Sequence, residues 1–167
     1  MHKLAHLRYP LILCVISSTL AACGSSVPTD SRCRNLVYKD EGLSRSEYLP
    51  CAAEIVAALD ELGPQSNAAL KGDRQARSQG QATLSRVNAL MQAAGGRNLL
   101  ERWNDRALTD LNVRISNAVT SYEAFYMVRV LEEPNQFAAQ TREAAASELR
   151  NATRNHQEAR TYYRRLQ

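Results

Sequence analysis

Few residues in this 167-residue chain could carry acid–base chemistry. It has three histidines, and only His156 lies beyond the N-terminal 22 residues. His156 falls on the apolar face of a predicted helix, where a histidine packed against a neighbouring helix is the more common situation. Glu132 and Glu133 precede Pro134 and are interpreted as a polar helix end rather than as paired catalytic carboxylates. We therefore predict no catalytic residue and no metal site.

Motifs typical of enzyme and cofactor sites are missing as well. The sequence contains no G-x-S-x-G elbow, no phosphate-binding loop and no dinucleotide fingerprint. No glutamate directly precedes a serine, the pair that marks a family of helical peptidoglycan-cutting lipoproteins. A small peptidoglycan-active enzyme is thus the least favoured function, and no cofactor or small-molecule substrate is expected.

The N-terminal residues have the pattern of an export signal. Lys3 and Arg8 supply positive charge without an acidic residue, and residues 11–20 form an apolar stretch about half as long as a membrane-spanning helix. Leu20-Ala21-Ala22-Cys23 follows. This run resembles the lipobox of bacterial lipoproteins. The resemblance implies that residues 1–22 are a signal peptide that is removed and that Cys23 is acylated, for example with palmitate.

An acylated Cys23 would hold the protein at a membrane, since several acyl chains anchor stably whereas a single chain binds only marginally. Gly24 follows the cysteine, which is similar to lipoproteins passed to the outer membrane. The expected location is therefore the cell outer membrane, facing the periplasm. An ordinary secretory leader with an accidental cysteine is the alternative.

Two further cysteines follow a short polar tether, which we place over residues 23–32. An even pair in an exported protein is typical of a disulfide. Cys33 and Cys51 are too far apart for the C-x-x-C motif of a catalytic dithiol. We predict a structural disulfide worth about 3 kcal/mol, which ties the segment after the tether to the first helix. Two unpaired thiols are the alternative.

Helix-forming residues dominate the remaining sequence, and alternating apolar patterns are almost absent. These features predict an all-α fold: residues 33–167 form a single domain, an up-and-down antiparallel helical bundle with two long C-terminal helices, preceded by the disulfide-tied N-terminal segment. Helices are expected over residues 44–62, 65–94, 99–132 and 134–167.

Local signals set the expected boundaries of the first two helices. Ser44 and Glu47 form a candidate capping box at the start of the first helix. Gly63-Pro64 is expected to end that helix, because glycine turns easily and proline cannot continue the hydrogen-bond pattern. Gly72 and Gly80 are each expected to weaken the first half of the second helix by about 1 kcal/mol relative to alanine.

Apolar residues at spacings of three and four define the predicted core faces of the last two helices. The predicted set is Leu108, Leu111, Ile115, Ala118, Tyr122 and Phe125, followed by Ala145, Leu149, Ala152, His156, Ala159, Tyr163 and Leu166. Alanine is frequent on these faces. Small residues allow close helix packing but bury little apolar area, so modest stability is expected.

Charge alternates in sign along the predicted helices. Net charges are −3 over residues 43–62, +4 over 63–97, −2 over 98–133 and +3 over 134–167. Alternation favours antiparallel neighbours, although each exposed pair contributes less than about 1 kcal/mol. The whole chain carries +4, or +2 once Lys3 and Arg8 are removed with the leader. This balance is too mild for a nucleic-acid partner.

Two surfaces are candidates for binding. Met127, Val128, Val130 and Leu131 lie off the main apolar stripe and form a candidate partner patch. The last helix has a cationic end made of Arg150, Arg154, Arg160, Arg164 and Arg165. Within it, Arg160, Arg164 and Arg165 are the candidate anion-binding residues. The first set forms a docking patch only if a third face of its helix stays exposed, and the alternative for the second is a solvated helix terminus.

The sequence favours a non-enzymatic, membrane-anchored envelope lipoprotein that acts as an adaptor or scaffold for another envelope protein. The alternative is a module that binds anionic glycan or lipid through the arginine-rich end of the last helix.

Overall fold

The structure is a computed structural model that describes residues 27–34, 36, 43–95, 105–128 and 138–167. Within these ranges the chain forms four helices and no strand. They are α1 (Arg45–Leu70), α2 (Arg74–Ala93), α3 (Arg106–Met127) and α4 (Ala138–Leu166). The all-α, antiparallel bundle predicted from the sequence is confirmed.

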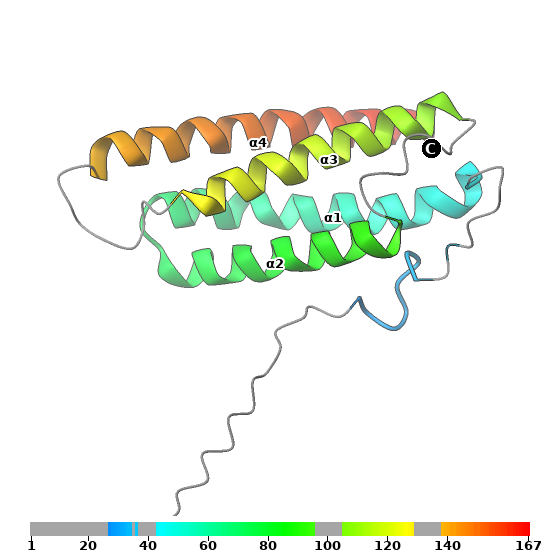
Figure 1. The fold of residues 1–167 in the computed structure, drawn as a ribbon, viewed down its shortest axis with the longest axis horizontal. Coiled ribbons are helices and arrows are strands. Elements are labelled where there is room, and N and C mark those ends of the chain that lie inside the picture. The colour runs from blue at the N-terminus through cyan, green and yellow to red at the C-terminus, as the bar shows by residue number, and fades with distance from the viewer. Residues whose placement is uncertain (1–26, 35, 37–42, 96–104, 129–137) are drawn as a thin grey trace, which may run out of the picture.

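The helices form two antiparallel pairs that pack against each other. Figure 1 shows α1 beside α2 and α3 beside α4, with α1 also in contact with the second pair. Every predicted core residue of α3 is buried, and on α4 only the last two, Tyr163 and Leu166, are partly exposed. The spacing of apolar residues therefore identified these two core faces correctly.

The predicted disulfide joins Cys33 to Cys51, with the two Cα atoms 4.7 Å apart and both residues fully buried. Hydrogen bonds from the Ser31 hydroxyl (2.6 Å) and the Arg32 amide (2.7 Å) to the Glu54 carboxylate hold the same segment on α1. Residues 31–33 are thus fixed to the N-terminal half of α1.

The start of α1 follows the predicted capping box. The Ser44 amide donates to the Glu47 carboxylate at 2.9 Å, and the Ser44 side chain accepts from the backbone of Glu47. These reciprocal bonds satisfy donors that the first helical turn otherwise leaves free. The prediction of this boundary is confirmed.

The prediction that Gly63-Pro64 ends the first helix is wrong. Helix α1 continues through both residues to Leu70. Leu62, Ser66 and Ala69 on either side of Pro64 are buried, so packing against the other helices outweighs the lost backbone bond.

The chain instead reverses at Gly72, whose φ of 100° is readily adopted only by glycine. The Asp73 side chain then accepts a hydrogen bond from the Ala76 amide at 2.9 Å and caps α2. The second helix consequently begins at Arg74 and not at residue 65, and the expected weakness at Gly72 is the actual break.

Helices α2 and α3 approach closely at Gly80. A Cβ atom at this position would lie 1.7 Å from the Tyr126 hydroxyl oxygen. That hydroxyl is 3.0 Å from the Ser66 hydroxyl, so the tyrosine bridges α3 to α1 across the face of α2. Glycine is therefore required for this packing.

Ion pairs between helices follow the predicted charge alternation only in part. Glu61 of α1 pairs with Arg86 of α2 at 2.7 Å, as the acidic and basic character of these helices suggests. Between α3 and α4 the signs are reversed, because Arg114 of the acidic helix pairs with Glu158 of the basic one. Net helix charge thus predicts neighbours but not individual pairs.

Candidate functional site

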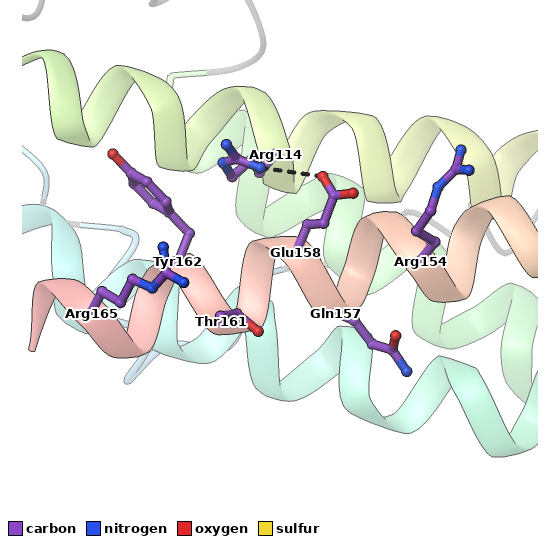
Figure 2. A pocket seen from close by; sticks show the side chains of 7 residues that line it. All are labelled: Arg114, Arg154, Gln157, Glu158, Thr161, Tyr162 and Arg165. Atoms are coloured by element: carbon purple, nitrogen blue, oxygen red, sulfur yellow. Dashed lines mark hydrogen bonds and ion pairs between the residues drawn. The ribbon is translucent and has the colours of Figure 1, made fainter.

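An open groove of about 320 Å³ runs between α3 and α4 (Figure 2). Most of its lining comes from α4, with one residue from α3. We call it the α3/α4 groove, and its lining residues are Arg114, Arg154, Gln157, Glu158, Thr161, Tyr162 and Arg165.

The middle of the groove is held by contacts between the two helices. The Arg114 guanidinium lies 3.2 Å from the Glu158 carboxylate and 4.9 Å from the centre of the Tyr162 ring, a cation–π distance. The Tyr162 hydroxyl in turn donates to Asp110 at 3.4 Å. Arg114 is thereby engaged in structural contacts, and it orients the aromatic ring in the groove.

The two other arginines that line the groove make no comparable contacts with described residues. Among the described residues, neither Arg154 nor Arg165 forms an ion pair, and Arg154 makes only a 3.4 Å hydrogen bond to Asn151. Three guanidinium groups against the Glu158 carboxylate give the groove a formal charge of +2. This arrangement is suited to binding anions.

A second groove, of about 330 Å³, adjoins the first on the other side of α4, against the C-terminal half of α1. We call it the α1/α4 groove, and it is lined by Asn67, Leu70, Ala146, Leu149, Arg150, Thr153, Arg154 and Gln157. Arg154 and Gln157 line both grooves. The exposed side of α4 therefore forms a wall that the two grooves share.

Arg150, Arg154 and Arg165 define what we call the arginine face of α4. All three are exposed, and their spacings of four and eleven residues are close to whole helical turns. Arg150 likewise pairs with no described carboxylate. The face therefore offers a row of cations that no described acidic residue neutralises.

The structure places the three predicted anion-binding residues differently. Arg165 lines the α3/α4 groove, whereas Arg164 is exposed but lines neither groove. Arg160 lies 3.5 Å from the Asp60 carboxylate of α1, so its charge is used within the bundle. The predicted anion-binding set left out Arg154, although it belongs to the same cationic end of the last helix, and it left out Arg114, whose register against α4 cannot be read from the sequence.

His156 is buried between α1 and α4, as the sequence suggested. Its Nε2 atom lies 3.0 Å from the Asp60 carboxylate. Burial lowers the pKa of His156; the Asp60 charge opposes this shift, and Arg160 adds to it. Burial also raises the pKa of the nearby Tyr122 to about 12, so its hydroxyl stays protonated at neutral pH. His156 lines neither groove, which favours a structural role.

The predicted partner patch is only partly within the described residues. Met127 is 80% exposed, and Val128 packs partly against the core. Val130 and Leu131 lie outside the described residues, as does the lipobox cysteine, Cys23. The described part of the patch therefore offers one large exposed apolar side chain.

In the part of the chain that the structure describes, no group of three or more His, Cys, Asp or Glu side chains could hold a metal ion. No helix in the described ranges has both the length and the apolar character of a membrane span. Comparisons of the chain with protein-family models, curated proteins and solved structures gave no match.

Proposed function

We propose that this protein is a non-enzymatic envelope lipoprotein, anchored through Cys23 at the outer membrane, that acts as an adaptor for another envelope protein. The arginine face of α4 is the observation that carries this proposal. It combines unpaired cations with two adjoining grooves on one side of a packed bundle. Such a surface is suited to steering and holding a negatively charged partner.

The anchor itself is tested by mass spectrometry of the full-length protein from bacterial membranes. The expected product begins at Cys23 and carries acyl groups, and the Cys23→Ser variant lacks them and leaves the membrane fraction. An unacylated, freely secreted product that begins at another residue overturns the anchoring.

The adaptor role is tested by affinity purification of the lipidated protein after cross-linking in cells. One stoichiometric envelope protein is expected, and the paired substitution Arg154→Glu/Arg165→Glu should abolish its recovery. Arg32→Glu/Arg74→Glu is the matched control, because both residues are exposed and line neither groove. Recovery of no stoichiometric partner by the unaltered protein contradicts the adaptor role.

A second candidate function is binding of an anionic glycan or lipid. The α3/α4 groove favours it, since an aromatic ring lies among guanidinium, amide and hydroxyl groups there. Salt-sensitive sedimentation with purified sacculi, lost with Arg165→Glu, would support the glycan binder. Sedimentation that is indifferent to salt and to this substitution excludes it.

A further inference from the structure

We propose, as a refinement that rests on the adaptor function, that the partner contributes an acidic amphipathic helix that lies along α4. The helix would place carboxylates against the arginine face and apolar side chains in the α1/α4 groove.

The length of the arginine face indicates an elongated ligand. Arg154 and Arg165 are eleven residues apart in one helix, which corresponds to about 16 Å along its axis. Arg150 extends the row by about 6 Å more. Figure 2 shows Arg165 and Arg154 at opposite ends of the α3/α4 groove, with Arg114 and Glu158 between them. A single small anion cannot engage both ends, whereas an anionic segment several turns long can.

The α1/α4 groove distinguishes between classes of elongated anion. Leu70, Ala146 and Leu149 give it an apolar floor directly beside Arg150 and Arg154. Leu149 is largely buried, and Leu70 is half-buried against the core. A polyphosphate chain has no apolar group to place there. An amphipathic helix carries both carboxylates and apolar side chains, so it matches both parts of the surface.

The spacing of the arginines also fits a helical partner. Carboxylates on one face of a partner helix, at intervals of four and eleven residues, would repeat the spacing of Arg150, Arg154 and Arg165. A guanidinium group can bind a carboxylate through two parallel hydrogen bonds, which favours defined register. The described contacts leave all three guanidinium groups without a carboxylate partner.

The test uses the purified full-length protein in neutral detergent and a labelled synthetic helix of about 18 residues, long enough to span the row. The probe carries glutamates at the matching spacing and leucines on the adjacent face. The control peptide has the same composition, but its glutamates are distributed around the helix. Fluorescence polarisation should show binding of the patterned peptide that is tighter by on the order of tenfold and weakens with added salt.

Arg154→Glu/Arg165→Glu should weaken this binding by on the order of tenfold or more, whereas Arg32→Glu/Arg74→Glu should leave it unchanged. Circular dichroism checks that each variant retains its helices. Equal binding of the two peptides, or binding unaffected by the charge reversal, overturns the inference. Tight, arginine-dependent binding of inorganic polyphosphate without binding of the patterned peptide also overturns it and favours a phosphate polymer.

These outcomes separate the inference from the function on which it rests. If cross-linking in cells still returns one stoichiometric partner while the patterned peptide fails, the acidic helix is wrong and the adaptor role stands. If cross-linking returns no partner, the adaptor role fails, whatever the peptide does.

Discussion

Gly80 offers the sharpest test of the packing between α2 and α3. On intrinsic helix propensity alone, Gly80→Ala should stabilise α2 by about 1 kcal/mol. In the folded bundle, however, the added Cβ would lie 1.7 Å from the Tyr126 hydroxyl oxygen and 2.6 Å from the ring carbon that bears it. Because real contacts of this kind are never so short, the Tyr126 ring must move.

Moving the ring has two costs. Forcing extra volume into a packed interface typically costs about 1–3 kcal/mol. The 3.0 Å hydrogen bond between the Ser66 and Tyr126 hydroxyls would also be lost, which costs about 1 kcal/mol. Together these outweigh the gain in propensity, so Gly80→Ala should lower the free energy of unfolding by about 1–3 kcal/mol.

Urea denaturation of the purified protein, followed by circular dichroism, measures this change. Tyr126→Ala provides the reference background, because it removes the atoms that a residue-80 Cβ would meet. In that background Gly80→Ala should stabilise the protein by up to about 1 kcal/mol. A stabilising effect of Gly80→Ala in the unaltered protein would refute the proposed close approach.

Three further predictions concern the interior of the bundle. Because burial lowers the pKa of His156, its neutral form is favoured in the folded state. The contribution of this residue to the free energy of unfolding should therefore be complete above the ordinary histidine pKa of about 6.5 and should fall as the pH drops below it. Urea denaturation at pH 7.5 and at pH 5.5 should show that His156→Gln loses less stability between the two pH values than the unaltered protein does. Reduction of the Cys33–Cys51 disulfide should lower the free energy of unfolding by about 3 kcal/mol, measured with and without reductant. Tyr48→Phe should cost about 1–3 kcal/mol in the same assay, because it removes the buried 3.0 Å hydrogen bond to Asn112; an unchanged midpoint would contradict this.

The helices with uninterrupted periodicity were the easiest to predict. In α3 and α4 the apolar residues recur every three or four positions, and this local pattern alone identifies the face that is buried. The end of α1 was predicted wrongly at Gly63 and Pro64, because whether these residues end a helix depends on its packing against other helices. The actual end of α1 does have a local sequence signal, because Gly72 adopts a positive φ and Asp73 caps the next helix. The stronger glycine–proline pair, however, comes earlier in the sequence and predicts a helix end there.

The candidate site was less accessible from the sequence, because it depends on the alignment of separate helices. Arg165 could be proposed from the charge of the α4 terminus. Whether a neighbouring arginine is available or already paired depends on the opposing helix, and here Asp60 engages Arg160. The position of Arg114 beside Tyr162 likewise follows from the register of α3 against α4.

The antiparallel course of α1 and α4 gives the arginine face a direction. The disulfide holds Cys33 on the N-terminal half of α1, and Figure 1 shows the C-terminal end of α4 at that same end of the bundle. Of the three arginines, Arg165 therefore lies nearest to the end of the bundle where residues 31–33 are attached, and Arg150 lies farthest from it. A partner helix bound along this row would therefore have one terminus at the end of the bundle that carries the disulfide-held residues 31–33 and the other terminus toward the opposite end.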